Sequence, residues 1–437
     1  MSDVLKTAGV TDWFVHDRFG MFIHWGIFAL PARHEQVMAN EKMTVEEYKK
    51  YFDHFDPDLY NPEEWADLAK EAGMKYFVIT TKHHDGFCLW DSKYTDYKAT
   101  NTPYGKDVLR PMVDAFRNNG LKVGLYHSLL DWHHPDYTLD WRHAQRNLSK
   151  ADQEKFNAGR DMARYREYLH SQIKELLTEF GKLDIMWFDF SFNMLCDIYP
   201  GLPGRGKDDW DSEAILKMVR RYQPWLILDD RLDLEGSWDV KTPEQYQPTE
   251  WVTYKGQKVV WEACQTFSGS WGYHRDEDSW KDTKQLLFML IDSVSKGGNL
   301  LLNVGPTGRG EIDNRAKERL KAMGDWMRYN SRSIYGCTQA PKEFKVDGNL
   351  ITYNPTTNRL YIHLVNYPPI GSFLMDGFPE RVEYAQFLHD HSEVVLNKHE
   401  FYGGGDQVIT YDTKTVFTVP VKKPNVEIPV VEVFLKG

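Results

Sequence analysis

Cysteine is scarce in this sequence, and the four residues that occur lie far apart: Cys88, Cys196, Cys264 and Cys337. No CxxC pair or cysteine–histidine spacing of a zinc site is present, so neither a zinc site nor a disulfide framework is expected. No apolar run reaches the ~18 residues that a membrane-spanning helix needs. The net charge is −11 and no Lys/Arg-rich run occurs. These absences argue against nucleic acid or an anionic membrane as partner.

The first ten residues, MSDVLKTAGV, lack the charged and apolar segments of a signal peptide. We therefore expect a cytoplasmic protein, or a secreted or periplasmic one if a leader has been removed. Apolar and charged contents of 41% and 27% are typical of a globular chain. Because 437 residues exceed an ordinary single core, we expect one large domain and a smaller one.

The first three quarters of the chain alternate between short apolar runs and amphipathic segments. The apolar runs are typical of buried parallel strands, at 20–26, 76–84, 122–130, 183–190, 225–231, 258–265 and 299–305. The amphipathic segments are predicted helices, at 63–73, 108–120, 162–181, 284–298 and 314–330. This alternation favours a (β/α) barrel, with a doubly wound sheet as the lesser option. An eighth strand is not visible, and 232–257 is predicted to be loop.

Beyond Tyr335-Gly336 the pattern changes to short alternating runs separated by Gly, Pro, Asn and Asp. The runs are 349–354, 359–365, 384–389, 408–412 and 430–436. They predict a small antiparallel β-sandwich of roughly a hundred residues. We therefore expect a barrel domain over residues 1–336 and a β-sandwich over 337–437.

Aromatic residues are abundant, at 15 Trp, 24 Tyr and 23 Phe. They either fill a large core or line a concave site for a ligand with an apolar face, such as a sugar. Polar side chains also follow nearly every predicted strand: His24, His83-His84-Asp85, His127, Asp189, Asp230-Arg231, Glu262 and Asn303. In a barrel the carboxyl ends of all strands meet at one face, where active sites are built. The recurrence of polar side chains at the strand ends favours an enzyme with an acid-containing pocket.

Two chemistries fit such a pocket. Clustered His83, His84 and Asp85 are typical of a metal-dependent hydrolase. However, adjacent strand residues point to opposite faces, so His83 and His84 are not expected to ligate one ion. Neither an H-x-H pair after the first strand nor an HExxH helix occurs. The structural alternative is that these histidines only hydrogen-bond nearby backbone.

Sugar hydrolysis instead needs two carboxyl groups flanking one glycosidic bond. Asp189, at a strand end between Trp187 and Phe190, fits the ionised one, although it could merely cap the next loop. The second comes from Glu35, Glu244 or Glu262. Glu262 sits in an apolar strand, where desolvation raises a carboxyl pKa, whereas Glu244 sits on a loop. Spacing does not choose between them.

Six motifs in order resemble the α-L-fucosidases of glycoside hydrolase family 29, over about residues 12–336. They are FGMFIHWGIFALPA, ITTKHHDGFCLWDSKYTDY, GLYHSLLDWHHPDY, IMWFDF, SWGY and SKGGNLLLNVGPTGRGEI. The resemblance implies a distorted (β/α) barrel with a C-terminal β-sandwich. It also implies retaining cleavage of terminal α-L-fucose through a covalent intermediate, with no metal and no other cofactor.

The resemblance also implies residue roles. Asp189 corresponds to the nucleophile, and Glu244 of 238-WDVKTPE to the acid/base, with Glu262 as runner-up. Residues corresponding to those that contact fucose are His24, Glu35, His83, His84, His127, Trp187, Arg231, Glu262 and Trp271. Trp271 resembles the aromatic that packs on the methyl-bearing edge of the sugar.

The chain departs from many relatives at two places. Gln36 stands where they have a tryptophan, and His127 follows Tyr126 where they have a second tyrosine. The expected partner is a fucosylated oligosaccharide or glycoconjugate. The sequence does not decide whether the chain forms a homo-oligomer. The alternative to an enzyme is a lectin-like binding module built on an inactive barrel. The sequence argues against it, because it retains both Asp189 and the candidate acids.

Overall fold

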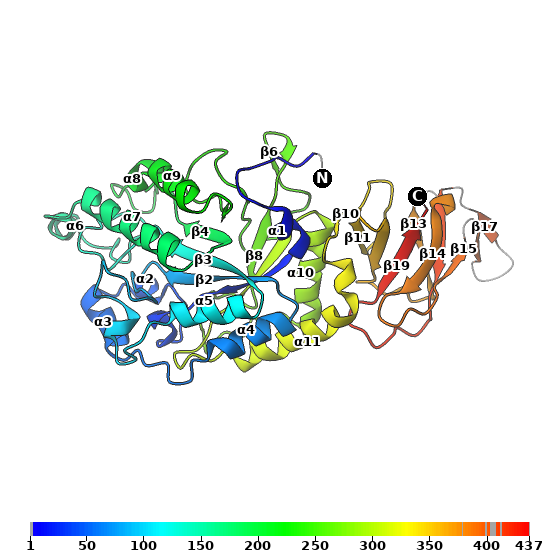
Figure 1. Cartoon of the computed structure of the whole chain (residues 1–437), viewed down its shortest axis with the longest axis horizontal. Helices are drawn as coiled ribbons and strands as arrows, with labels where there is room; N and C mark the ends of the chain where they lie inside the picture. Colours follow the sequence, from blue (N-terminus) through cyan, green and yellow to red (C-terminus); the bar gives the residue numbers. More distant parts are fainter. Residues whose placement is uncertain (1–2, 378, 398–399, 403–407, 411–412, 437) are drawn as a thin grey trace.

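The computed structural model describes residues 3–377, 379–397, 400–402, 408–410 and 413–436. Figure 1 shows a parallel sheet surrounded by helices, followed along the chain by antiparallel sheets at the far end of the molecule. The predicted combination of a (β/α) barrel and an antiparallel β-sandwich is confirmed. No helix of the described residues is long and apolar enough to cross a bilayer.

Seven parallel strands form the barrel sheet, in the order β5-β4-β3-β2-β1-β9-β8. They are β1 (Phe19–Ile23), β2 (Tyr76–Lys82), β3 (Lys122–Ser128), β4 (Ile185–Asp189), β5 (Ile227–Leu228), β8 (Glu262–Thr266) and β9 (Asn299–Val304). Each lies within or beside one of the seven predicted runs. Neighbours in sequence are neighbours in the sheet, as the strand–helix alternation predicts for a barrel.

The sixth barrel position, between β5 and β8, is filled by an irregular segment. The amides of Asp239 and Val240 donate to Leu228 O, and Lys241 N donates to Val260 O. Isolated parallel bridges join Lys241 to Trp261 and residue 244 to residue 264. Residues 232–257, predicted as loop, thus include a partial strand, followed by a small hairpin of β6 (Thr253–Tyr254) and β7 (Gln257–Lys258).

Long helices cover the outside of the sheet (Figure 1). They are α4 (Pro62–Glu71), α5 (Leu109–Asn118), α7 (Met162–Glu179), α9 (Ser212–Tyr222), α10 (Thr283–Ser295) and α11 (Asn314–Asn330). Local signals fix their ends: Asn61 caps α4, Pro62 opens it, and Gly73, with φ of 89°, follows it. The five predicted helices are confirmed.

Shorter helices lie in the connections. They are α1 (Asp12–Asp17), α2 (Val37–Asn40), α3 (Val45–Asp53), α6 (Lys150–Asn157), α8 (Lys207–Trp210), η1 (Ile27–Ala29), η2 (Ala99–Asn101), η3 (Ser331–Ser333) and η4 (Pro379–Arg381). The helix α2 and the loops before it bring residues 33–36 over the carboxyl end of the sheet, where the site lies.

The antiparallel part begins with β10 (Thr338–Gln339). A five-stranded sheet has the order β10-β11-β12-β19-β14, with β11 (Leu350–Asn354), β12 (Arg359–His363), β14 (Val382–Phe387) and β19 (Val430–Leu435). A three-stranded sheet contains β13 (Ser372–Asp376), β18 (Lys414–Thr418) and β15 (Val395–Asn397), and β16 (Glu400–Tyr402) pairs with β17 (Val408–Thr410). Of the predicted strand 408–412, residues 411–412 lie outside the described residues. The domain limits at 336/337 stay a prediction.

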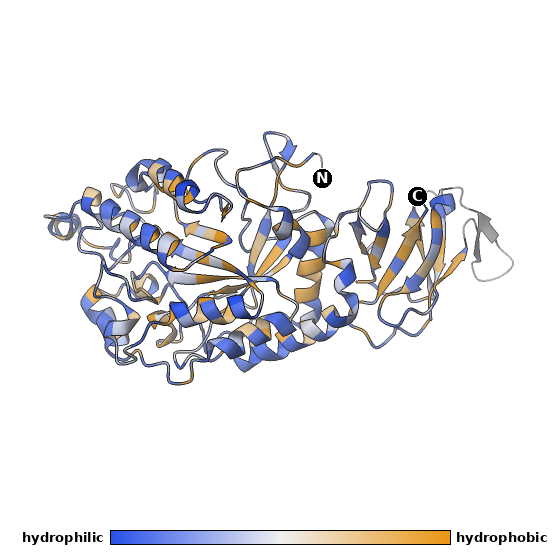
Figure 2. Cartoon of the chain, viewed as in Figure 1, coloured by the Kyte–Doolittle hydropathy of each residue, from blue (hydrophilic) through white to orange (hydrophobic). Residues whose placement is uncertain are grey.

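Strand alternation divides the barrel core into two layers. Phe22, Tyr126, Trp187 and Leu301 form part of an interior cluster, whereas their sequence neighbours pack outward against the helices. Figure 2 shows α10 as the most uniformly hydrophobic of the long helices. This helix packs against β9, α11 and β11, so it is buried between the barrel and the antiparallel sheet, as such a composition requires.

Candidate active site

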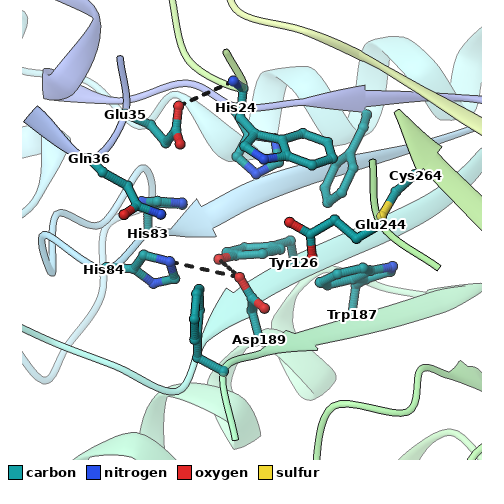
Figure 3. Close-up of a pocket in the computed structure, with 13 residues that line it drawn as sticks. His24, Glu35, Gln36, His83, His84, Tyr126, Trp187, Asp189, Glu244 and Cys264 are labelled. Atoms are coloured by element: carbon teal, nitrogen blue, oxygen red, sulfur yellow. Dashed lines mark hydrogen bonds and ion pairs between the residues drawn. The ribbon is translucent and has the colours of Figure 1, made fainter. Parts of the chain in front are cut away.

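The carboxyl end of the barrel sheet surrounds one pocket of about 360 Å³. It is lined by Phe22, His24, Glu35, Gln36, His83, His84, Tyr126, Trp187, Asp189, Phe190, Glu244, Cys264 and Trp271. Figure 3 shows the carboxylates of Asp189 and Glu244 facing the same space, with Tyr126 beside them. The pocket therefore brings together three of the four predicted acids, Asp189, Glu35 and Glu244, with three of the four predicted histidines, His24, His83 and His84.

Asp189 is the last residue of β4 and is 8% exposed. The Tyr126 hydroxyl donates to its Oδ2 at 2.7 Å, and His84 Nε2 lies 3.8 Å from the same atom. Arg231 Nη1 donates to Oδ1 at 3.3 Å. Burial raises the pKa of Asp189 to about 6, while Arg231 acts to lower it. The buried acid is thus paired, and it is mainly ionised at neutral pH.

Arg231 joins this carboxylate to a second one. Its Nη2 donates to Glu244 Oε2 at 2.9 Å while Nη1 holds Asp189. The rest of the guanidinium is fixed as well: Nε donates to Thr242 Oγ1, and Cζ lies 4.9 Å from the Trp187 ring centroid. One immobilised cation therefore sets the positions of two pocket carboxylates.

Glu244 reaches the pocket from the irregular sixth position of the barrel. The chain there is held by Cys264 N, which donates to Pro243 O, and by Gln245 N, which donates to Cys264 O. The Glu244 side chain is 41% exposed, in contrast to the buried Asp189. The two carboxylates thus differ in solvent access, as two groups with different tasks require.

Glu35 is almost fully buried beneath the loop that carries Trp271. Its Oε2 accepts from the backbone amides of Trp271 and Gly272, at 3.2 and 2.9 Å. Residue 272 must be glycine for this approach, because a Cβ there would lie 2.9 Å from the Glu35 Cβ. Burial raises the pKa of Glu35. Its Oε1 lies 3.1 Å from His34 Nδ1 and makes no hydrogen bond with any described residue.

His24 is fixed in one tautomer by Asn303. The Asn303 amide donates through Nδ2 to Trp271 O at 2.7 Å, so Oδ1 faces His24 Nδ1 at 2.6 Å. Nδ1 therefore carries the proton and Nε2 remains an acceptor. Burial lowers the pKa of His24 to about 3, which keeps the ring neutral. Asn303 acts on the site by orienting this ring and the Trp271 loop.

Solved structures share this arrangement of strands and helices. The α-L-fucosidase isoenzyme 1 from Paenibacillus thiaminolyticus is 41% identical, with a TM-score of 0.89 over 98% of this chain and 99% of that one. A family 29 α-L-fucosidase from Bacteroides thetaiotaomicron, trapped as a covalent intermediate with 2-fluoro-fucosyl fluoride, is 27% identical, with a TM-score of 0.82 over 99% and 98%.

Sequence comparison gives the same family. Tissue α-L-fucosidase of Homo sapiens is 28% identical over 84% of this chain and 78% of its own length. The family model described as α-L-fucosidase matches residues 2–332. The chain belongs to the α-L-fucosidase family. It is a glycoside hydrolase of that family, and the resemblance found from the motifs is confirmed.

The histidine pair lies differently from the expectation for a strand. Strand β2 ends at Lys82 after a register shift between Thr80 and Lys82, so His83 and His84 no longer alternate. Both rings line the pocket, with centroids 4.0 Å apart, and the prediction that they face opposite sides is wrong. Within the described residues, no group of three His, Cys, Asp or Glu is arranged to hold a metal ion.

The expectation that His127 contacts the ligand is not supported by its position. His127 is buried on the outward face of β3, where its Nδ1 lies 3.0 Å from Thr81 Oγ1 and its ring contacts Trp90. The residue before it, Tyr126, points inward and holds Asp189. Strand alternation from Tyr126 was the available signal, and the sequence prediction missed this tyrosine.

Glu262 is the second predicted site residue that lies outside the pocket. The predicted strand 258–265 begins only at Glu262, which pairs with Asn299 at the start of β9. The prediction that Glu262 ends its strand is therefore wrong: it lies at the amino end of the barrel, hydrogen-bonded by the hydroxyl of Tyr76, the first residue of β2. It does not line the pocket.

An apolar wall completes the pocket. Trp271 contacts Phe22 and His24, with ring centroids 5.9 and 5.0 Å apart, and Trp187 contacts Phe22 at 5.4 Å. Buried polar atoms interrupt this wall: among the described residues, His83 Nδ1 and Trp187 Nε1 have no hydrogen-bond partner. Aromatic faces alternating with unsatisfied polar atoms suit a sugar ring.

Proposed function

We propose that this chain is a retaining, exo-acting α-L-fucosidase that removes terminal α-L-fucose from oligosaccharides or glycoconjugates. The observation that carries the proposal is the bridge formed by Arg231 between Asp189 and Glu244 in one pocket. Two carboxylates that touch one guanidinium are near neighbours, as the ~5–5.5 Å separation of a retaining pair requires. The trapped covalent intermediate of the Bacteroides relative supports the same chemistry here.

In the first step Asp189 is the nucleophile. Its carboxylate oxygen forms a bond to the anomeric carbon while the bond from that carbon to the leaving oxygen breaks. Glu244 gives a proton to the leaving oxygen. Arg231, which favours the ionised form of Asp189, keeps the nucleophile charged, and the Tyr126 hydroxyl fixes the orientation of the carboxylate.

In the second step water hydrolyses the covalent fucosyl-enzyme intermediate. Glu244, now ionised, takes a proton from a water molecule whose oxygen bonds to the anomeric carbon. The bond to Asp189 breaks and its carboxylate is regenerated. The solvent access of Glu244 supports this assignment, because the group must exchange a proton with bulk water once per turnover.

The remaining pocket residues hold the sugar. We assign the fucose hydroxyls to the pocket-lining residues His24, Glu35, His83, His84 and Trp187, which present neutral nitrogens and a buried carboxyl, and to Arg231, which bridges the two carboxylates. Trp271 supplies the apolar surface for the methyl-bearing edge. The inner end of the pocket is closed by the interior barrel cluster, which favours recognition of a terminal sugar.

Glu244 is preferred to Glu262 as acid/base on position. Glu262 lies at the opposite end of the barrel interior and is only 1% exposed. The Bacteroides intermediate was trapped with a glutamate-to-glutamine mutant, which agrees with a glutamate in this role.

Labelling with 2-fluoro-fucosyl fluoride tests the proposal. We expect a stoichiometric mass increase by one fluorofucosyl group, and peptide mapping should locate it on Asp189. Label on another carboxylate would contradict the assignment of the nucleophile, and absence of both label and fucoside hydrolysis would contradict the function.

A further inference from the structure

A second cavity of about 520 Å³ adjoins the candidate active site. Gln36, His84 and Phe190 line both spaces, so the two spaces are adjacent. Phe190 follows the nucleophile with φ of 69°, an unfavourable backbone conformation for an aromatic residue. This conformation places the Phe190 ring in the wall between the two cavities.

Arg142 projects into this cavity without an anionic partner. Its guanidinium stacks on the rings of Trp141 and Phe190, at 4.6 and 4.9 Å. Among the described residues it makes no ion pair and no side-chain hydrogen bond, and its Nε is buried without a partner. Such stacking holds the cation in place while its N–H groups remain free.

Arg146 supplies a second positive charge. Its Nη1 donates to His143 O at 3.2 Å, its guanidinium lies 5.3 Å from the Tyr199 ring, and no described carboxylate pairs with it. Burial, together with the charge of Arg146, lowers the pKa of Arg142, while the charges of Asp189 and Asp140 act to raise it. In a chain of net charge −11, two neighbouring unpaired arginines in one cavity are unusual. A bound anion would relieve their repulsion.

We propose that this cavity is a subsite for a carboxylate or sulfate group carried by the substrate, bound by Arg142 and Arg146. The proposal rests on the proposed function of the adjoining pocket. The anion belongs either to the leaving group or to a substituted hydroxyl of the fucose ring. Guanidinium groups bind both anions bidentately, and the aromatic walls accept the adjoining apolar surface.

Cys196 provides a test that needs no enzymatic activity. It lines this cavity, and it is the one cysteine of the four that is not buried. We would measure its rate of reaction with an anionic and with a cationic methanethiosulfonate. The ratio of these rates should fall about tenfold in Arg142→Gln/Arg146→Gln, because two positive charges near the thiol are removed.

Two variants control this measurement. Arg328→Gln, at an exposed position on α11, changes the net charge outside the cavity and should leave the ratio unchanged. Arg142→Lys/Arg146→Lys keeps both charges and should retain most of the anionic preference. An unchanged ratio in the double glutamine variant, with thermal unfolding like that of the wild type, would overturn the proposal.

Kinetics then identify the source of the anion. The substrates are 4-nitrophenyl α-L-fucoside, its analogue with a carboxylate on the aryl ring, and its analogue with a sulfate on a fucose hydroxyl. In the double glutamine variant, kcat/KM for one anionic substrate relative to the neutral one should fall about tenfold.

A fall for the carboxylated aryl fucoside places the anion on the leaving group, and a fall for the sulfated fucoside places it on the sugar. A fall for neither overturns the subsite. If the wild type hydrolyses no fucoside, the proposed function fails, while the thiol measurement still tests the charge of the cavity.

Discussion

The barrel interior holds a carboxyl group at each end, and the two have different partners. Asp189, at the carboxyl end, contacts the Arg231 cation and the Tyr126 hydroxyl. Glu262, at the amino end, has the hydroxyl of Tyr76 as its side-chain hydrogen-bond partner among the described residues and has no cation beside it. Burial raises the pKa of both, to about 6 for Asp189 and about 8 for Glu262.

This difference in partners accounts for the different protonation states of the two buried carboxyl groups. At pH 7 these values leave Asp189 ionised and Glu262 protonated, each by roughly ten to one. Desolvation alone produces a neutral, structural acid, whereas an added cation and an opening to the pocket produce a reactive anion. Changes at the two ends of the barrel should therefore have separable effects on catalysis and on stability.

Replacement of Asp189, the proposed nucleophile, should have the largest effect. Asp189→Ala should lower kcat for 4-nitrophenyl α-L-fucoside by at least roughly 10³-fold, because no covalent intermediate forms. Thermal unfolding should show a folded protein, since the substitution removes a desolvated charge. Residual activity within an order of magnitude of the wild type would show that another group attacks the sugar.

The next largest effect should distinguish Glu244 from Glu262, because replacing them should change kcat to different extents. Glu244→Gln should lower kcat by roughly 10²–10⁴-fold for substrates with poor leaving groups, and less for 4-nitrophenyl fucoside, which needs little protonation. Glu262→Gln mimics the protonated side chain and should leave kcat and KM near the wild-type values. A loss that depends on the leaving group in Glu262→Gln, and not in Glu244→Gln, would reverse the assignment.

Removal of the shared cation should change the pH profile. Arg231 lowers the pKa of Asp189, so Arg231→Met should raise that pKa above about 6. Because the proposed mechanism requires ionised Asp189, the acid limb of kcat/KM should move to higher pH by roughly one unit. An acid limb at the wild-type position, measured on aryl fucoside from pH 4 to 8, would show that Arg231 does not control this carboxylate.

The smallest effect concerns stability at the amino end. Glu262 has a folded pKa of about 8, above its unfolded value, so the native state binds more protons. Its contribution to the free energy of unfolding is therefore full at low pH and decreases as pH rises toward 8. Glu262→Gln removes this dependence.

The Tm difference between Glu262→Gln and the wild type should thus become more favourable to the variant from pH 5 to pH 8, by several degrees, because a pKa raised from 4.5 to about 8 corresponds to roughly 3 kcal/mol over this range. A constant difference across this range would contradict the assigned pKa of Glu262.

Much of the fold was predictable because it depends on local pattern. The strand runs are short, apolar and bounded by turn residues, and helix ends such as Asn61-Pro62 and Gly73 follow known preferences. The sixth barrel position was not predictable, because residues 238–245 pair through single bridges and include Pro243, which has no amide to donate.

The site was predicted in part. Asp189 and the histidines at strand ends follow from barrel topology, but Glu35 and Trp271 meet across 236 residues, and only the family resemblance brought them together. The prediction that His127 contacts the ligand did not take strand alternation from Tyr126 into account. Glu262 was misplaced because 258–261 has strand-like composition although the strand starts afterwards.

The most direct test of the central claim uses azide and two variants. With an activated aryl fucoside, Asp189→Ala should form β-L-fucosyl azide, because azide attacks directly from the face that the nucleophile vacates. Glu244→Ala should form α-L-fucosyl azide, because azide displaces Asp189 from the intermediate. The anomers are distinguished by NMR. The α anomer from Asp189→Ala, or no azide product from either variant, would contradict the account.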